Sequence, residues 1–340
     1  MYLSYNDVSI IPRNFSNIHH REECYPYLTD FNIKSLPIFT APMSCIVLEE
    51  NLNDYINNNI TPILPRNIPY DVRIKYMSKG YWVAMSLEEF NETEFPKISK
   101  VCVDVANGHM MYLYDCINAK KEKYPKLVIM TGNIANPNLL DTIVKWGSVD
   151  YIRLGIGGGS GCITSSNTGI HCPMASLIHN ATLYRYNWNA KENKNKIKII
   201  ADGGIRNYSD VIKALALGAN YVMIGSLFSQ CYESNKDEIY YKTSDGKYKH
   251  TRCLDGDIYH KFYGMASKQG QIDLFGEKKH TAEGIAKYLP IKYTLKQWTD
   301  NMKDYLQSAM SYCNAKNLEE FYENSKIIDI SNNSYLAINK

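Results

Sequence analysis

The chain has 340 residues, of which 45% are hydrophobic, so it can bury one large core or two smaller ones. Its 38 basic and 35 acidic side chains leave a formal charge of +3, which is too small to argue for a nucleic-acid or membrane partner. The sequence shows neither a secretory leader nor an apolar stretch of the roughly 20 residues that span a bilayer. Its 9 cysteines include no Cys-x-x-Cys pair, and their odd number argues against a closed disulfide framework. We therefore expect a soluble, cytoplasmic protein.

Short apolar segments rich in β-forming residues recur along the chain at fairly even intervals. Alternation of such strands with helical segments predicts a parallel sheet, and eight units at this length predict an α/β fold of the closed (β/α)8 TIM-barrel type. A doubly wound open sheet competes, but no Gly-x-Gly-x-x-Gly follows the first strand. Helical spacing is clearest over 138–146 and over 209–217, where Ser209 or Asp210 is the predicted N-cap. The predicted strands are 37–43, 61–65, 82–86, 101–106, 127–132, 151–156, 197–201 and 221–225.

A glycine-rich loop follows the sixth predicted strand and ends near a cysteine. Residues 155–164 read Gly-Ile-Gly-Gly-Gly-Ser-Gly-Cys-Ile-Thr. Glycine permits positive φ and close approach to the backbone, so such a loop can surround an ion while its amides stabilise a thiolate. We predict Cys162 as a nucleophile and the Thr164 hydroxyl as a nearby proton relay. The alternative is a flexible linker with an incidental cysteine.

Polar and glycine residues follow five consecutive predicted strands, at the end where barrel enzymes place their chemistry. The polar and glycine residues after any one strand are explained by a helix cap or a turn. Such residues after five strands, all at the same rim of the barrel, are harder to explain by caps and turns alone. Glycines after the last two strands match the usual phosphate site of such barrels, so a phosphorylated small molecule is the predicted ligand. The segments are 104–109, 131–133, 155–164, 202–204 and 225–226.

Four motifs resemble the IMP dehydrogenase and GMP reductase family across nearly the whole chain. The cysteine loop is similar to the family's Gly-x-Gly-x-Gly-Ser-x-Cys-x-Thr, and further matches lie at 200–205, 222–227 and 307–312. The resemblance implies a single (β/α)8 barrel domain over 1–340 without CBS modules. It also implies a mobile flap around 268–290 and a C-terminal helical segment around 295–325.

Three features resemble the GMP reductases more than the IMP dehydrogenases. Only about twenty residues separate 66–69 from the third strand, which leaves no room for an inserted pair of CBS modules. The flap segment 271–279 contains neither the Arg nor the Tyr that activates water in the dehydrogenases. Residues 262–265 and 168–169 look like the reductase versions of their loops. The resemblance thus implies an NADPH-dependent oxidoreductase of purine salvage. The alternatives are an IMP dehydrogenase lacking CBS modules, a catalytically silent purine-nucleotide-binding barrel, and a flavin-binding barrel.

By this resemblance Cys162 attacks C2 of GMP, ammonia leaves, and hydride from NADPH yields IMP and the free thiol. Thr164 and Glu283 are expected to protonate the leaving amine, although a lone Glu283 is otherwise a solvated surface carboxylate. Whether the nucleotide is a ribo- or deoxynucleotide, and whether NADPH or NADH is used, stays open. The expected substrate-binding residues are Ser160, Asp202, Gly203, Gly204, Gly225, Ser226, Gly264, Met265, Ala266, His280 and Gly284.

The resemblance also implies a homotetramer, in which some residues reach the NADPH of a neighbouring subunit. His20, Arg21 and the segment 308–311 are expected to do so. Carbonyl oxygens of Gly157, Gly159 and Cys162 are a predicted potassium site, and the alternative is a loop ordered without an ion. The expected cofactor-binding residues are His20, Arg21, Arg66, Asp104, Val105, Ala106, Ile156, Gly157, Ser308, Ala309, Met310 and Ser311.

Overall fold

The computed structural model describes residues 2–31, 33–96, 99–192, 197–254 and 256–338. Parallel strands form an eight-stranded sheet in the order β4-β11-β10-β9-β8-β7-β6-β5. A parallel bridge between Phe39 and Thr61 joins the first and last of these strands and closes the barrel. The predicted (β/α)8 architecture is therefore confirmed, and each strand overlaps its predicted segment. The strands are β4 (Ile38–Thr40), β5 (Ile63–Leu64), β6 (Trp82–Met85), β7 (Lys100–Asp104), β8 (Val128–Ile134), β9 (Tyr151–Leu154), β10 (Lys198–Asp202) and β11 (Tyr221–Ile224).

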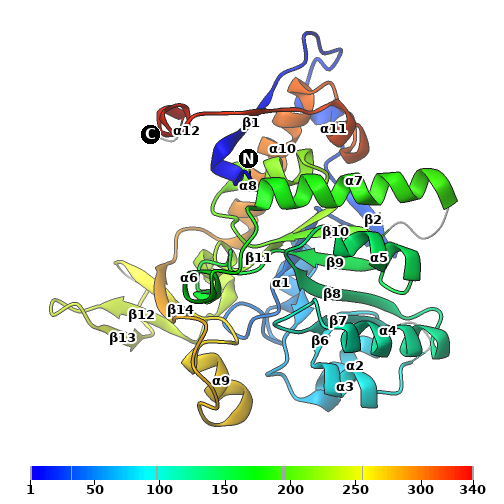
Figure 1. Ribbon diagram of the computed structural model, residues 1–340. Coiled ribbons are helices and arrows are strands. Elements are labelled where there is room, and N and C mark those ends of the chain that lie inside the picture. Colours follow the sequence, from blue (N-terminus) through cyan, green and yellow to red (C-terminus); the bar gives the residue numbers. More distant parts are fainter. Residues whose placement is uncertain (1, 32, 97–98, 193–196, 255, 339–340) are drawn as a thin grey trace.

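Helices follow the strands and cover the outside of the barrel (Figure 1). The predicted helix over 138–146 is α5, whose Leu140 and Ile143 are buried and whose C-terminus ends at Gly147 with φ of 68°. The predicted cap of the helix at 209–217 is wrong. That helix begins earlier, and the Asn207 side chain caps it by accepting from the Asp210 N–H at 3.0 Å. The helices are α1 (Leu52–Asn57), α2 (Tyr70–Ser78), α3 (Leu87–Glu92), α4 (Met111–Lys123), α5 (Leu139–Trp146), α6 (Thr164–Thr168), α7 (Met174–Glu192) and α8 (Tyr208–Ala216).

Between β5 and β6 the chain forms only α2 and its two connections, so no CBS modules interrupt the barrel there. None of the helices in the described part of the chain is long and apolar enough to cross a membrane.

Several elements outside the barrel were not expected from the sequence. The strands β13-β12-β14-β15 form an antiparallel sheet after β11, and β1 pairs with β16 near the C-terminus (Figure 1). The predicted flap region 268–290 consists of α9, a connection and β15; its mobility stays a prediction. The predicted helical segment 295–325 contains α10 and α11. The elements are β1 (Val8–Ile11), β2 (Leu28–Asp30), β3 (Ile33–Ser35), β12 (Ile239–Lys242), β13 (Tyr248–Thr251), β14 (Ile258–Phe262), α9 (Lys268–Phe275), β15 (Lys287–Pro290), α10 (Leu295–Tyr312), α11 (Leu318–Asn324), β16 (Lys326–Asp329), α12 (Asn332–Ile338) and the short 3-10 helices Tyr5–Asp7, Arg21–Glu23, Phe228–Gln230 and Tyr232–Ser234.

An aromatic cluster fills the barrel at the amino ends of its strands. Phe39, Trp82, Tyr151 and Tyr221 pack with ring centroids between 4.9 and 6.0 Å apart, mostly edge to face. Such pairs contribute about 0.5–1.5 kcal/mol each beyond their buried area. The hairpin β2–β3 lies below this cluster, where Asp30 accepts hydrogen bonds from the hydroxyls of Tyr151 and, at 2.9 Å, Tyr221.

The Asp30 carboxylate is the polar link between the hairpin and the barrel. Burial alone raises the pKa of Asp30, but hydrogen bonds from Tyr151 and Lys198 outweigh burial and lower this pKa. A carboxyl with a lowered folded-state pKa contributes stability above its unfolded pKa of about 3.9 and loses it as pH falls through the folded pKa.

We expect Asp30→Asn to lower the free energy of unfolding at neutral pH by roughly 1.5–3 kcal/mol, the contribution of hydrogen bonds to a charged group. The deficit should shrink as pH falls through the lowered folded-state pKa of Asp30, below which the wild-type carboxyl is also protonated. Urea unfolding of both proteins across this pH range measures the effect. A deficit that does not depend on pH would contradict the role given to the charge.

Candidate active site

A tight turn at the carboxyl end of β9 carries the predicted nucleophile. Gly155 and Gly157 have φ of 124° and 75°, where side chains are disfavoured. A Cβ at Gly157 would lie 2.4 Å from Cβ of Ser165, and one at Gly155 would lie 2.2 Å from the Asp202 carbonyl oxygen. The two glycines therefore let the loop turn back against α6 and β10. The loop delivers Cys162 to the rim of the barrel immediately before α6.

Cys162, Thr164 and Glu283 form a continuous chain of hydrogen bonds. Sγ of Cys162 donates to Oγ1 of Thr164 at 3.2 Å, and this hydroxyl donates to Oε2 of Glu283 at 2.8 Å. The thiol and hydroxyl residues are half-buried, whereas Glu283 is exposed. Such a chain can carry a proton between a solvent-exposed carboxyl group and a group bonded at the sulfur.

Backbone hydrogen bonds hold the segment that bears Glu283 against the cysteine loop. The Ile163 N–H donates to the Glu283 carbonyl at 2.9 Å, and the Ile285 N–H donates to the Gly161 carbonyl at 2.8 Å. The Glu283 N–H donates to the Ala266 carbonyl at 3.0 Å. The distance between carboxylate and thiol is thus set by main-chain contacts as well as by the Thr164 hydroxyl.

A cavity of about 210 Å³ opens beside Cys162. Apolar walls come from Met43, Met223 and Phe262, and Glu283 contributes a charged edge. We call this cavity beside Cys162 the nucleotide cavity. All of the predicted substrate-binding residues except His280 line it. They are Ser160, Asp202, Gly203, Gly204, Gly225, Ser226, Gly264, Met265, Ala266 and Gly284.

One predicted phosphate contact is already used within the protein. The Gly204 N–H donates to the Gly158 carbonyl at 2.9 Å, so this amide points into the cysteine loop rather than at a ligand. The Gly204 amide is therefore not free for a phosphate in this arrangement, and the role of Gly204 in substrate binding stays a prediction. Gly204 still forms part of the cavity wall.

A larger cavity of about 490 Å³ adjoins the first, and the two share Met43, Asp202, Met265 and Glu283 among their walls. We call it the outer cavity. Gln271 and Phe275 of α9 form its far side, and His280 lies there rather than in the nucleotide cavity. Its lining includes the predicted cofactor-binding residues Arg66, Asp104, Val105 and Ala106. The outer cavity is therefore the place where a second reactant can meet a nucleotide bound beside Cys162.

The remaining predicted cofactor residues line neither of these two cavities. Ile156 and Gly157 belong to the cysteine loop, where the Ile156 carbonyl contacts Nδ1 of His171 at 2.9 Å. The others lie together at α10 and its neighbours: Ser16 Oγ donates to the Ser311 carbonyl at 2.7 Å, and Arg21 pairs with Asp304 at 2.9 Å. Met310 is fully buried in the core, so its side chain faces no ligand within this chain. The residues of this second group are His20, Arg21, Ser308, Ala309, Met310 and Ser311.

The predicted potassium ligands already accept hydrogen bonds within the loop. The Gly157 carbonyl accepts from Ser165 Oγ at 3.1 Å, and the Gly159 carbonyl accepts from the Cys162 N–H at 2.9 Å. Each carbonyl oxygen has a second lone pair, so the set remains compatible with an oxygen-coordinated cation. Potassium binding stays a prediction.

Arg153 is the site residue that sequence reasoning missed. Its guanidinium is buried in β9, where Nη1 lies 2.7 Å from Asp104 Oδ1 and Nη2 lies 2.9 Å from Asp202 Oδ2. Burial alone lowers the pKa of Arg153, but the two carboxylates outweigh burial and raise it. Asn133 donates to Asp202 Oδ2 at 2.8 Å and to the Gly155 carbonyl at 2.7 Å. A charged residue inside an otherwise apolar buried strand was the signal available in the sequence.

Residues 90–337 match the family described as "IMP dehydrogenase / GMP reductase domain". The chain belongs to the IMP dehydrogenase and GMP reductase family. It is 34% identical over 241 residues to an inosine-5'-monophosphate dehydrogenase of Chlorobaculum parvum, an alignment that covers 69% of this chain and 46% of that protein. It is 29% identical over 331 residues to a GMP reductase of Helicobacter pylori, with 93% of this chain and 92% of that protein covered.

Both branches of the family are thus represented among its relatives. A GMP reductase of Caenorhabditis elegans is 28% identical over 241 residues, covering 70% of this chain and 62% of that protein. The chain spans about half the length of the IMP dehydrogenases it matches, 46% for the one from Chlorobaculum parvum. Membership of the IMP dehydrogenase and GMP reductase family confirms the resemblance seen in the cysteine loop.

Proposed function

We propose that this protein is a GMP reductase that converts GMP to IMP and ammonia. The observation that carries the proposal is the chain from Cys162 through Thr164 to Glu283 at the junction of two cavities. The nearly full-length alignment with the Helicobacter pylori GMP reductase supports the same assignment.

The thiolate of Cys162 forms a bond to C2 of the purine, and the C2–N bond breaks as ammonia leaves. The amine needs a proton to depart, which Glu283 delivers through the Thr164 hydroxyl. When bound in the outer cavity, a nicotinamide would supply the hydride that C2 needs, while Cys162 holds C2 until the C–S bond breaks and IMP leaves. Met265 and Ala266 line both cavities, so the nucleotide and the cofactor meet beside them, where the hydride is transferred.

The residues that line the outer cavity are of the kinds that can bind a nicotinamide cofactor. Arg66 offers a guanidinium at one wall, where Nη1 lies 3.4 Å from the Asp104 carbonyl oxygen. Phe275 and Leu274 of α9 add an apolar surface on the side of the predicted flap. We propose NADPH as the cofactor, a mobile α9 that opens this cavity, and a potassium ion at the cysteine loop.

Incubation with GMP and NADPH, with absorbance loss and ammonia release followed together, tests the proposal. The reverse trial supplies IMP and NAD and separates the nucleotide products. Residues 268–282 contain neither Arg nor Tyr to deprotonate water, and general-base assistance contributes about 10²–10⁴ in rate. We therefore expect XMP synthesis to be slower than GMP reduction by at least about 10².

An IMP dehydrogenase is the second candidate, favoured by the 34% identity to the Chlorobaculum parvum enzyme. Sustained XMP synthesis over many turnovers, without comparable formation of IMP from GMP, would establish it instead.

Glu283→Gln should slow ammonia departure by roughly 10² or more, because only this step needs a proton delivered to nitrogen. Hydride transfer should change little. Single-turnover release of ammonia from GMP measures the first step, and reduction of NADP+ by IMP without ammonia, which runs hydride transfer in reverse and needs no deamination, measures the second. Glu277→Gln, which changes an exposed carboxylate of the same segment, is the matched control. Equal slowing of both steps by Glu283→Gln would argue against the relay.

We further propose a cytoplasmic homotetramer in which His20, Arg21 and the 308–311 segment reach the outer cavity of a neighbouring subunit. Their grouping at α10 and the neighbouring 3-10 helix Arg21–Glu23, outside the lining of both cavities of their own chain, supports this arrangement. Sedimentation measures the assembly directly, and a fully active monomer would contradict it.

A further inference from the structure

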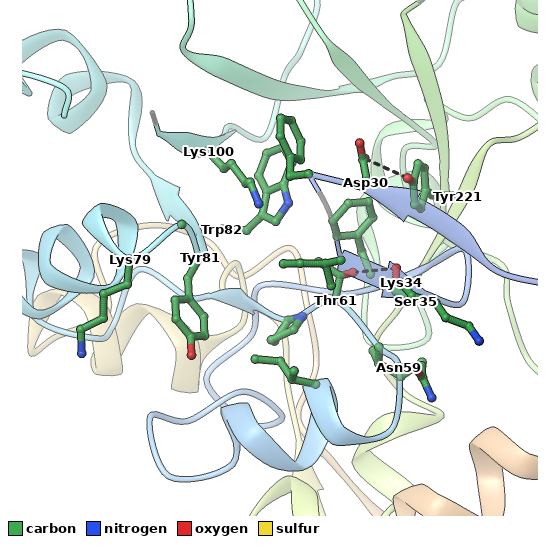
Figure 2. A pocket seen from close by; sticks show the side chains of 17 residues that line it. Asp30, Lys34, Ser35, Asn59, Thr61, Lys79, Tyr81, Trp82, Lys100 and Tyr221 are labelled. Atoms are coloured by element: carbon green, nitrogen blue, oxygen red, sulfur yellow. Dashed lines mark hydrogen bonds between the residues drawn. The ribbon is translucent and has the colours of Figure 1, made fainter. Parts of the chain in front are cut away.

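A third cavity lies at the opposite end of the barrel from Cys162. It has a volume of about 270 Å³ and sits between the β2–β3 hairpin and the amino ends of β4 to β7 (Figure 2). Aromatic rings form much of its wall, and lysine side chains and small polar groups contribute the rest together with aliphatic residues. The aromatic residues are Phe31, Phe39, Tyr81, Trp82 and Tyr221. We call it the floor cavity.

Lys100, the first residue of β7, is turned into the floor cavity (Figure 2). Only 5% of the residue is exposed, and its Nζ lies 4.3 Å from the centre of the Phe31 ring. Among the described residues Nζ has no hydrogen-bond acceptor and no ion-pair partner. Burial lowers the pKa of Lys100, while the nearby Asp30 raises it in part. The Lys100 ammonium thus faces the cavity without a protein acceptor, and an acceptor bound in the cavity would stabilise it.

Asp30 does not serve as that acceptor. Its carboxylate receives hydrogen bonds from the hydroxyls of Tyr151 and Tyr221, and Lys198 Nζ lies 2.9 Å from both of its oxygens. Asp30 is therefore already neutralised by another lysine.

Trp82 supplies a second donor at the same cavity. Its side chain is one of the lining residues drawn in Figure 2, and the residue is 4% exposed. The indole N–H has no acceptor in the part of the chain that the structure describes. Two donors, one charged and one neutral, thus border a cavity with aromatic walls.

We propose that the floor cavity binds a small aromatic carboxylate. A carboxylate can accept hydrogen bonds from the Lys100 ammonium and from the Trp82 N–H, and its negative charge is opposite to that of Lys100 and of the other two lysines in the lining, Lys34 and Lys79. The volume lies just below the usual 300–1,000 Å³ of ligand sites, which suits a one-ring acid rather than a nucleotide. The aromatic walls pack against the ring of such a ligand.

The test uses 4-fluorobenzoate as the probe and fluorine NMR as the readout. We expect saturable binding to the wild-type protein and binding weaker by roughly tenfold or more for the neutral 4-fluorobenzamide. Lys100→Met should also weaken 4-fluorobenzoate binding by roughly tenfold or more, because it removes the charged donor and keeps the side-chain volume. Lys79→Met is the matched control, since Lys79 lines the rim and points away from the cavity (Figure 2).

The thermal midpoint of Lys100→Met shows whether this variant folds, and we expect it to equal or exceed the wild-type value because an unpaired buried charge is removed. Trp82→Phe is a second variant, expected to weaken binding roughly two- to tenfold through loss of one neutral hydrogen bond. The proposal is overturned by absent binding to the wild-type protein, by equal affinity for the acid and the amide, or by equal losses in the Lys100 and Lys79 variants.

Discussion

Cys162→Ser is expected to lower kcat for the reduction of GMP by at least about 10³-fold, because a serine hydroxyl of high pKa cannot replace the thiolate. The affinity for GMP should remain largely unchanged. The residues that line the nucleotide cavity opposite the sulfur, among them Asp202 and Ser226, come from β10 and the turn after β11. NADPH oxidation gives kcat, and calorimetric titration with GMP gives the affinity.

Cys116→Ser is the matched control for this experiment. Cys116 is half-buried in α4, where its sulfur accepts a hydrogen bond from Asn91 at 3.2 Å, and it lines neither cavity beside Cys162. Its replacement should leave kcat near the wild-type value. A Cys162→Ser protein with comparable kcat would exclude the covalent mechanism.

Arg153→Met is expected to lower the free energy of unfolding by about 3 kcal/mol, because it leaves the half-buried carboxylates of Asp104 and Asp202 without their shared buried cation. Reduction of GMP should fall as well, since both carboxylates line the outer cavity. Denaturant unfolding measures the stability, and the slope of the transition shows whether the native state remains compact.

Two further variants separate the charge effect from a packing effect. Adding Asp104→Asn to Arg153→Met should recover part of the lost stability, because it removes one uncompensated charge. Lys296→Met breaks an exposed pair with Asp300 and should change stability by less than about 1 kcal/mol. A loss of stability in Arg153→Met no larger than in Lys296→Met would contradict the role of the buried pairs.

The barrel was predictable because each of its strands is a local signal. A buried parallel strand is a short continuous apolar run, and the eight runs stand out in the sequence without any knowledge of distant contacts. The outer antiparallel sheet escaped prediction because its strands lack such runs. In β13, Tyr248–Thr251, two of four residues are exposed and the others are half-buried.

The residues of the candidate site likewise include some with a local sequence signal and some without one. Cys162 and Thr164 lie in one loop with a recognisable pattern, so the sequence places them together. The role of Arg153 depends on carboxylates 49 residues away in both directions along the chain, on β7 and β10. Only the strand order β7-β8-β9-β10 brings these side chains together. Glu283 was found through family resemblance alone, because an exposed glutamate carries no local signal of its contact with Thr164.

The main-chain hydrogen bonds between the cysteine loop and the 283–285 segment hold Glu283 near Thr164. Glu283 can therefore donate its proton only while this segment lies against the loop. If that segment docks for only a fraction of the time, the rate of the protonated step is scaled by the same fraction. A substitution that shifts this equilibrium by 1.4 kcal/mol changes the rate about tenfold at low occupancy without altering any reacting group. Under the proposed mechanism, departure of the amine would therefore be fastest while the 283–285 segment lies against the cysteine loop.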